Sequence, residues 1–240
     1  TRCPRKQEGC SKTRKKNVRS QTQGSGKAMS CITVIWGRDG VGKTHLGLTY
    51  PKPLLLDNDR RYQFVHPKFP QAEIWEILIP LALDNAESTP SWENHLSLLK
   101  QALSYSCQTV IVDTVTRMRQ IGLASTPDKQ QRRAPYHYSW VNNQLEEVVA
   151  SIRESKKHGV LIHRAGDEFV DERRTGKDTI EGYKDIRYLA DLVLHLEPVG
   201  PVISTTIEKC AWTYKLHGLS FPDITYSKLM DIITQTLQKE

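Results

Sequence analysis

The sequence predicts an α/β fold in which a mostly parallel central sheet is flanked by helices. Short apolar runs alternate with helix-like segments from residue 31 onward, which is typical of such sheets. The run from Gly37 to Thr44 fits G-x-x-x-x-G-K-[ST] and lies between a predicted strand and a predicted helix. Another apolar strand ends in Asp113, some 70 residues later. Together these observations predict a P-loop NTPase fold.

The predicted elements follow one another without an internal repeat or a linker between residues 30 and 240, so one domain is expected there. Strands are predicted at seven apolar runs, 31–36, 53–57, 73–78, 108–113, 159–163, 191–197 and 202–209. Helices are predicted at four segments, 43–49, 91–105, 139–157 and 225–238.

Two long polar stretches, 116–138 and 164–187, follow the fourth and fifth predicted strands and are expected to be loops. Loops of this length inside a compact domain are usually functional or mobile. Because both leave the carboxyl ends of parallel strands, they should lie at the same edge of the sheet as the P-loop, where ligands bind in open α/β sheets.

The composition of the 240 residues argues against several classes of protein. Hydrophobic residues make up 38%, enough for a core, yet no stretch approaches the roughly 20 apolar residues of a membrane span. The N-terminus lacks the apolar segment of a secretory signal. The five cysteines are scattered and form no C-x-x-C pair, which argues against a disulfide framework or a zinc site. We therefore expect a protein of a reducing compartment with no membrane partner.

The positive charge is concentrated at the N-terminus. Residues 1–28 hold nine Lys or Arg against Glu8, a net +8, so the total of +7 leaves the rest of the chain at −1. Residues 1–29 are also polar and lack aromatic side chains, which predicts a disordered basic tail. The tail is either a nucleic-acid-binding arm or a remnant of upstream translation or cloning, because Met29 immediately precedes the first strand.

The P-loop motif predicts binding of ATP and Mg²⁺. Its glycines allow several backbone N–H groups to face one phosphate, Lys43 would reach the β- and γ-phosphates, and the Thr44 hydroxyl would hold the metal ion. The residues expected to contact the nucleotide are Gly37, Arg38, Asp39, Gly40, Val41, Gly42, Lys43 and Thr44.

Two further acidic strand ends are candidates for catalysis. Asp113 ends the run Thr109–Asp113 in the form of a Walker B segment and would reach Mg²⁺, unless it merely caps the strand. Asp59 follows the run 54–56 and would orient the attacking water, with Asp57 as the second choice. The alternative for these two is a turn built by Asp and Asn side chains.

Two candidates from later strands complete the expected site. His163 ends the strand 159–163 and would contact the γ-phosphate, although a histidine there can equally be held by a structural hydrogen bond. Lys209 ends the strand 202–209 and would project toward a nucleotide, in cis or across a subunit interface, unless it is an ordinary surface lysine.

The stretch 116–140 interleaves cations with aromatic residues, a pattern that suits single-stranded nucleic acid because cations pair with phosphates and rings stack on bases. The alternative is a solvated loop anchored by Tyr136 and Trp140. The candidate nucleic-acid contacts are Arg117, Arg119, Lys129, Arg132, Arg133, Tyr136 and Tyr138. The stretch 164–184 mixes both charges, so its charge alone does not indicate DNA binding.

The order of these motifs resembles that of phage-encoded nucleotide-binding proteins with a RecA-like core, some of which are single-strand annealing recombinases. The P-loop itself is specific only to the superfamily. The runs Pro-Lys-Pro-Leu-Leu-Leu-Asp at 51–57 and Ala-Asp-Leu-Val at 190–193 point to this family more narrowly. The resemblance covers about residues 31–236, nearly the whole body of the chain.

The resemblance implies a RecA-type ATPase core that binds single-stranded DNA with ATP. It places the catalytic carboxylate at Asp59, where the family usually has a glutamate, and the γ-phosphate sensor at His163. It places the two DNA-contacting loops at about 116–138 and 164–184, and it makes Lys209 the nearest match to the basic residue that a neighbouring subunit supplies. It also implies a ring or filament of identical subunits, a single-strand-binding protein as a partner, and a location in the host cytoplasm.

Three functions therefore remain open at the level of the sequence. The first is an ATP-hydrolysing, single-strand DNA-binding protein of phage recombination, annealing or replication. The second is a small-molecule or nucleotide kinase, in which Arg164, Arg173 and Arg174 would be lid arginines. The third is a nucleotide-gated scaffold with little turnover, which the shorter Asp59 side chain would favour.

Overall fold

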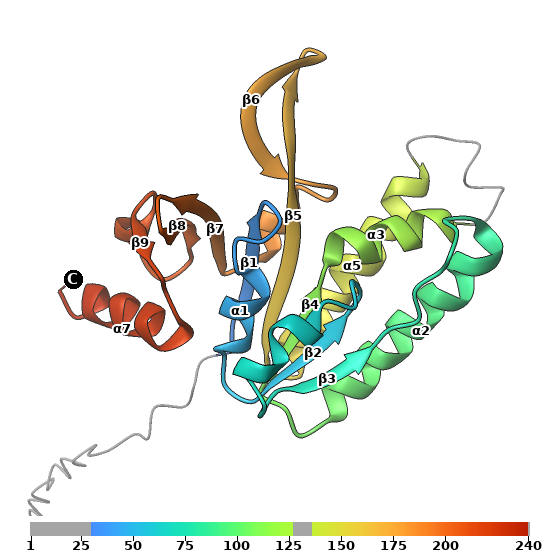
Figure 1. Cartoon of the computed structure of the whole chain (residues 1–240), viewed down its shortest axis with the longest axis horizontal. Helices are drawn as coiled ribbons and strands as arrows, with labels where there is room; N and C mark the ends of the chain where they lie inside the picture. Colours follow the sequence, from blue (N-terminus) through green and yellow to red (C-terminus); the bar gives the residue numbers. More distant parts are fainter. Residues whose placement is uncertain (1–29, 127–135, 240) are drawn as a thin grey trace, which may run out of the picture.

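The computed structural model describes residues 30–126 and 136–239. The basic tail and the candidate residues Lys129, Arg132 and Arg133 lie outside the described residues, and so does the side chain of Tyr136. The chain forms three layers, with a twisted sheet between two layers of helices (Figure 1). No helix in the described part of the chain is both long and apolar enough to cross a membrane.

The sheet has the strand order β3-β2-β4-β5-β1-β7-β8-β9, and β6 pairs with β5 outside this path. The strands from β3 to β7 in this order are parallel to their neighbours, whereas β8 and β9 pair antiparallel. The strands are β1 (Ile32–Gly37), β2 (Pro53–Asp57), β3 (Glu73–Glu76), β4 (Thr109–Asp113), β5 (His158–Val170), β6 (Arg173–Ile180), β7 (Leu192–Val199), β8 (Val202–Cys210) and β9 (Ser220–Pro222).

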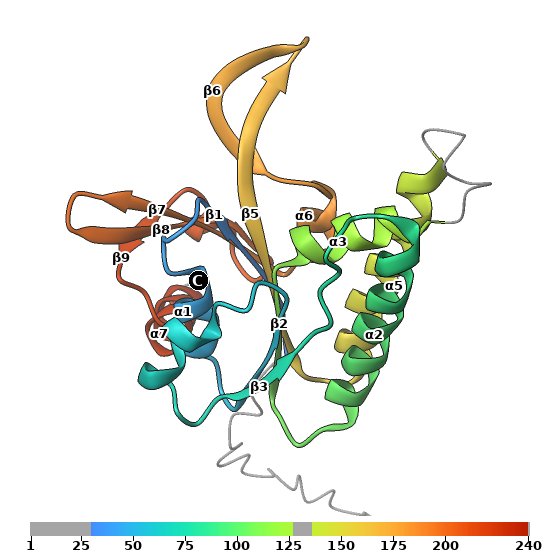
Figure 2. The ribbon, with the colours of Figure 1, turned by 45° about the vertical axis from the view of Figure 1, so that its right-hand side comes forward.

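The helices cover both faces of the sheet, as Figure 2 shows from a second side. One face packs against the apolar sides of α2, α3, α5 and α6, and the other against α1 and α7. The helices are α1 (Lys43–Leu48), α2 (Asn85–Ser104), α3 (Val115–Ala124), α5 (Tyr136–Glu154), α6 (Ile186–Leu189) and α7 (Tyr226–Leu237), with 3-10 turns η1 (Tyr62–Phe64), η2 (His66–Lys68) and η3 (Tyr214–Leu216). The predicted class, α/β with a mostly parallel sheet flanked by helices, is confirmed.

Successive side chains of the central strands alternate between the two faces. In β1, Val34 and Trp36 point toward the α2–α3–α5 layer, whereas Ile35 points toward α1. In β5, Leu161 joins the first of these cores and Ile162 joins the second. This alternation decides which polar residues at the strand ends face the P-loop, because the P-loop leads into α1.

The two stretches predicted as long loops are largely ordered. β5 runs seven residues past the predicted strand end at 163 and folds back through β6, giving a two-stranded hairpin that stands away from the body (Figure 1). The stretch 116–138 contains most of α3 and the start of α5, joined through residues 127–135, which are not described. β6 was not recognised because a ribbon exposed to solvent needs no apolar alternation. α3 does bury Val115, Met118 and Ile121 at helical spacing, but the cations between them favoured a loop.

The predicted helix 91–105 begins earlier, at Asn85. Asp84 caps it by accepting a hydrogen bond from the backbone N–H of Glu87, so the Ser91 region lies inside the helix. Ser91 instead donates its hydroxyl to the carbonyl of Leu78, which ties the loop after β3 to α2.

Candidate functional site

The P-loop connects β1 to α1 at the carboxyl edge of the sheet. Gly37 has φ +154°, and a Cβ at this position would come within 2.3 Å of the Leu196 carbonyl oxygen, so the close approach to β7 requires glycine. Gly42 has φ +80° at the N-cap of α1, a conformation that glycine adopts without strain. The motif therefore fixes the backbone path that exposes its N–H groups.

Lys43 is buried beneath this loop. Its ammonium group donates to the carbonyls of Gly37 at 2.9 Å and Arg38 at 2.7 Å. Burial lowers the pKa of Lys43, and the nearby carboxylates of Asp39 and Asp113 oppose this shift. A phosphate in the loop would supply the counter-charge that this partly desolvated cation lacks.

Thr44 and Asp113 meet as the P-loop and Walker B motifs predict. The Thr44 hydroxyl donates to Asp113 Oδ2 at 2.5 Å. Burial raises the pKa of Asp113 to about 6, with smaller contributions from Asp59 and Asp57 in the same direction. A hydroxyl and a carboxylate are the hard oxygen ligands that Mg²⁺ prefers, and a cation here would relieve the repulsion among the acids. These residues therefore fit the metal ion that P-loop proteins usually use.

The end of β2 forms a turn in which each polar residue has a distinct partner. Asp57 is buried and accepts hydrogen bonds from the backbone N–H groups of Asp59 (3.0 Å) and Tyr62 (3.2 Å). Asn58 bridges α2 to the residue after Walker B, because its side chain contacts His95 Nε2 at 2.6 Å and donates to the Thr114 carbonyl at 3.1 Å. The turn interpretation thus holds for Asp57 and Asn58.

Only the backbone N–H of Asp59 takes part in this turn, and its side chain faces the site. A cavity of about 300 Å³ opens above the P-loop, and its lining residues include Gly42, Lys43, Thr44, Asp59 and Asp113. Arg61 and Phe64 also line it, and neither was among the candidates. The signal that could have found Arg61 is the pair of arginines directly after the acidic end of β2. An apolar cavity of about 370 Å³ adjoins the first and shares Gly42 with it.

Asp59 is bound by Arg164, the residue that follows His163. The Arg164 Nη2 donates to both carboxylate oxygens, at 2.9 Å and 2.8 Å. Arg164 also contributes to the lowered pKa of Lys43, which places it in the electrostatic neighbourhood of the P-loop. The sequence singled out Arg164 as a kinase lid residue, but the structure brings it to the candidate carboxylate.

His163 is not brought together with the P-loop. It pairs in register with Trp36, and both lie on the α2–α3–α5 face of the sheet, opposite to α1. The ring is buried, and burial lowers its pKa to about 4. Neither ring nitrogen has a hydrogen-bond partner that satisfies normal geometry among the described residues. The structure does not place His163 for the γ-phosphate contact that the sequence predicts. Side chains alternate along the strand, so Arg164 rather than His163 faces the site.

Lys209 also lies away from the P-loop in this chain. It pairs with Val193 near the start of β7, and its ammonium donates to the carbonyls of Arg187 (3.0 Å) and Tyr188 (3.2 Å) in α6. The expected contact in cis is therefore replaced by a bond to the backbone of α6. The position of Lys209 relative to a neighbouring subunit stays a prediction.

Three of the seven candidate nucleic-acid contacts have described side chains, Arg117 and Arg119 on α3 and Tyr138 on α5. Arg119 lies over the Tyr138 ring, with its guanidinium carbon 5.4 Å from the ring centroid, and its Nε donates to Asn142 at 3.2 Å. Arg117 contacts Gln120 at 3.4 Å. Arg119 and Tyr138 thus hold the two helices together as well as offering a cation and a ring.

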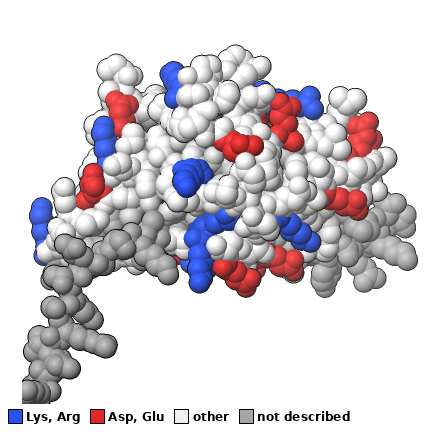
Figure 3. All heavy atoms as spheres, turned by 90° about the horizontal axis from the view of Figure 1, so that it is seen from below, with Lys and Arg blue, Asp and Glu red and all other residues white. Residues whose placement is uncertain are grey.

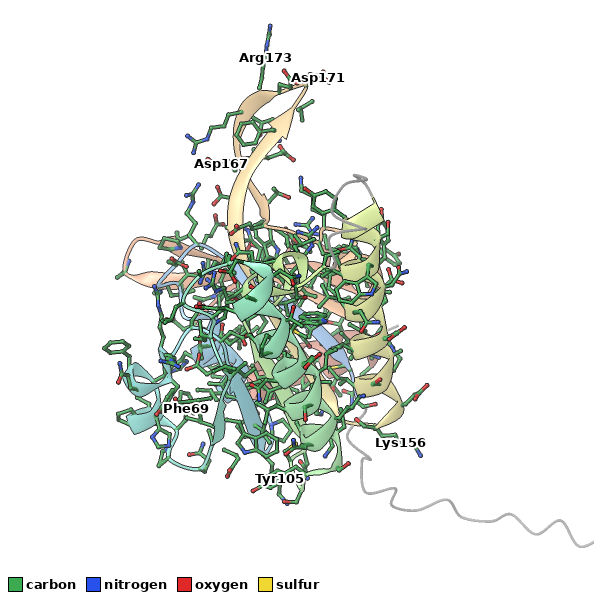
Figure 4. All side chains as sticks on the ribbon, turned by 90° about the vertical axis from the view of Figure 1, so that its right-hand side faces the viewer. Phe69, Tyr105, Lys156, Asp167, Asp171 and Arg173 are labelled. Atoms are coloured by element: carbon green, nitrogen blue, oxygen red, sulfur yellow. The ribbon has the colours of Figure 1, made fainter. Side chains whose placement is uncertain are left out.

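The hairpin is joined to the P-loop by ion pairs. Arg38 donates to both oxygens of Asp178 on β6, at 2.7 Å and 2.5 Å, and lies 3.4 Å from Asp167 on β5. Arg38 lowers the pKa of Asp178 mainly through this hydrogen bonding. Asp167 in turn pairs with Arg174 at 2.6 Å. Figure 4 shows Asp167 on the hairpin and Asp171 and Arg173 at its tip, away from the body.

Comparison with known proteins agrees with the geometry of this site. The family of AAA domains matches residues 30–215. Among solved structures, the RadB recombinase superposes with a TM-score of 0.51 at 16% identity, covering 81% of this chain and 86% of that one. A KaiC-like protein from Pyrococcus horikoshii OT3 gives 0.49 at 13% identity, covering 81% and 85%. No curated protein matches. The chain belongs to the AAA domain family of P-loop nucleotide-binding proteins, and its fold is RecA-like.

Proposed function

We propose that this protein binds ATP with Mg²⁺, hydrolyses it to ADP and phosphate, and acts on single-stranded DNA in phage recombination, annealing or replication. The observation that supports it most is the convergence of Lys43, Thr44, Asp59 and Asp113 around one cavity. These residues come from three separate strand ends, and together they provide a cation for the phosphates, two oxygen ligands for a metal ion and a second carboxylate.

The residues divide the work of hydrolysis among them. The P-loop backbone and Lys43 would bind the phosphates, and Thr44 with Asp113 would hold Mg²⁺, which would supply positive charge against the phosphates. Asp59 accepts a hydrogen bond from the water that attacks the γ-phosphorus, and the bond between that phosphorus and the bridging oxygen breaks to leave ADP. The apolar cavity beside the P-loop, lined by Leu46, Val65 and Ile224, suits the base.

Single-stranded DNA is assigned to the α3–α5 junction. Arg119 and Tyr138 lie there, Arg117 lies two residues before Arg119 on α3, and the sequence of the undescribed segment 127–135 adds Lys129, Arg132 and Arg133. At the opposite end of the molecule, where the strands begin, basic and acidic side chains are interspersed (Figure 3). The resemblance to RecA-like recombinases, the RadB fold and this concentration of cations support the same assignment. A ring or filament of identical subunits is part of the proposal.

The kinase hypothesis receives less support from the geometry. Its lid arginines would need to reach a bound phosphate, but Arg164 pairs with Asp59 and Arg174 pairs with Asp167 on the hairpin. The scaffold hypothesis differs from ours only in turnover, so the same measurement decides it.

The test is ATP hydrolysis with and without single-stranded DNA, with Lys43→Ala as the blank. We expect turnover that DNA stimulates and that the variant lacks. Turnover that ignores DNA, together with phosphoryl transfer to a nucleoside monophosphate, would select the kinase. ATP binding without turnover, even with DNA, would select the scaffold.

A further inference from the structure

Arg164 lies at the point where β5 leaves the parallel sheet and enters the hairpin. On one side Ile162 and His163 still pair with β1, and on the other side Ala165 pairs with Ile180 of β6. The Arg164 backbone N–H donates to Thr116 Oγ1 of α3 at 3.0 Å, and its carbonyl accepts from the Glu181 N–H at 2.9 Å. The backbone of Arg164 is therefore fixed jointly by α3 and by the returning strand of the hairpin.

The side chain of Arg164 extends from this fixed backbone to Asp59, which lines the nucleotide cavity. One nitrogen, Nη2, binds both oxygens of Asp59, and the two side chains are mostly buried, at 30% and 15% exposed. Asp59 lines the cavity, whereas Arg164 is not among its described lining residues, so the guanidinium supports the carboxylate from behind. Arg164 Nε is buried without a hydrogen-bond partner in the described part of the chain.

The pair leaves Asp59 able to act. A carboxylate has about four lone-pair directions, and a single shared donor uses two of them, so both oxygens can still accept a hydrogen bond from water. An aspartate also has one rotatable bond fewer than a glutamate, so once Arg164 holds the carboxylate few other directions remain open to it. Small misplacements of a reacting group are costly, about 100-fold for 1 Å.

We propose that Arg164 is a positioning residue for Asp59, through which α3 and the β5–β6 hairpin set the direction of the catalytic carboxylate. This inference rests on the proposed function, in which Asp59 orients the attacking water. A ligand that shifts α3 or the base of the hairpin moves Arg164 and thereby changes the rate of hydrolysis. It does so without a direct contact to ATP, so nucleotide affinity is largely unaffected.

The experiment measures kcat and KM for ATP in the full chain, with Mg²⁺ present, for Arg164→Gln, Arg164→Lys, Asp59→Asn and the double variant Asp59→Asn with Arg164→Gln. The matched control is Arg153→Gln, which removes a comparable ion pair with Asp191 (3.0 Å) at the opposite end of the sheet. We expect Arg164→Gln to lower kcat about 10- to 100-fold while KM changes less than about twofold. Arg164→Lys should recover part of the loss, and Arg153→Gln should leave kcat at the wild-type value.

The double variant separates positioning from a general structural effect. If Arg164 acts through Asp59, Arg164→Gln causes no further loss in the Asp59→Asn background. An equal loss in both backgrounds, or a change confined to KM, would overturn the inference. If Arg164→Gln does not fold, the same comparison with Arg164→Lys decides. Wild-type protein without turnover would overturn the proposed function and the inference together, whereas active wild type with unaltered Arg164 variants overturns only the inference.

Discussion

The nucleotide cavity and the β5–β6 hairpin share one strand but are held in place by different forces. Residues 158–163 of β5 are buried between β4 and β1, and the cavity is built on the ends of such buried strands. Beyond Arg164 the strand has a single partner, β6, and Phe169 and Val170 near its tip are 59% and 55% exposed. The base of the hairpin joins the core through Ile180, whereas farther out the exposed pairs of Arg38 with Asp178 and Asp167 hold it to the P-loop.

One chain thus combines a rigid nucleotide cavity with a hairpin whose ion pairs can exchange. Apolar burial on both faces fixes the cavity, since moving any of its strands would expose a core. Exposed ion pairs contribute little free energy and exchange partners with added charge or salt. The exposed ion pairs of the hairpin can therefore exchange without disturbing the sheet.

The largest expected effect on kcat comes from a substitution in the nucleotide cavity. Asp113→Asn keeps the size of the side chain but removes the charge that would bind Mg²⁺, so kcat should fall by about 100-fold or more. Asp171→Asn at the hairpin tip removes the same charge and is the matched control, for which kcat should be unchanged. Equal losses in both variants, measured by steady-state phosphate release, would remove the contrast between the two regions.

The second prediction uses the two faces of β5. Because the pKa of buried His163 is about 4 when folded, against about 6.5 unfolded, the unfolded chain binds more protons between these values. The free energy of unfolding should therefore fall as the pH drops from about 6.5 toward 4, by about 2 kcal/mol at pH 5 from this group. His163→Leu should lack this component while keeping ATP turnover.

The measurement is urea unfolding of wild type and His163→Leu at pH 7.5 and pH 5. The difference between the two proteins isolates His163 from other groups that titrate in this range, such as His95, whose pKa is also lowered to about 4 by burial. Loss of ATP turnover in His163→Leu at neutral pH, with stability retained, would restore the γ-phosphate role predicted from the sequence.

The third prediction concerns the segment between α3 and α5. Arg132→Ala with Arg133→Ala should weaken single-stranded DNA binding about tenfold and reduce the salt slope by about 1.4, since each phosphate contact contributes about 0.7. ATP binding should be retained. Lys100→Ala with Lys239→Ala removes two exposed lysines elsewhere and is the control. Titrations at several salt concentrations check this, and an unchanged slope would move the DNA site away from the segment.

The smallest effect is expected from the tether between the hairpin and the P-loop. Asp178→Asn removes the charge that Arg38 binds, and because the pair is exposed, the midpoint of thermal unfolding should stay within about 1 °C of wild type. Tryptic cleavage at the exposed hairpin residues Arg173 and Arg174 should become about threefold faster. Unaltered cleavage would mean that other contacts hold the hairpin.

The parts of the fold that the sequence predicted are those with strong apolar patterns. The run Thr109–Asp113 and the P-loop appear where expected because a buried strand and a glycine-rich turn each need specific residue types. β6 was missed, since its sequence RRTGKDTI has no apolar alternation and is stabilised by pairing with β5. Local patterns do not encode a partner that lies elsewhere in the chain.

The same contrast between strong local motifs and isolated polar residues holds for the site. Thr44 and Asp113 are joined by a hydrogen bond because their motifs specify both position and chemistry. His163 was expected at the site, but its neighbour Arg164 lies there instead. Adjacent residues of a strand point to opposite faces, and the sequence does not indicate which face packs against α1. The in-cis contact expected of Lys209 is not formed, because a lysine at a strand end carries no information about the carbonyls it meets, and its contact across a subunit interface stays a prediction.

The backbone amides of β5 should differ in their protection from hydrogen exchange. A single strand passes from a buried core to a two-stranded ribbon at Arg164, so its backbone amides belong to two regimes of hydrogen exchange. We expect the inner amides, from 160 to 163, to exchange only when the whole domain unfolds, and those beyond 166 to exchange through local fraying of the hairpin. The boundary falls at Arg164, which holds Asp59, so the least protected part of the strand should begin directly beside that carboxylate.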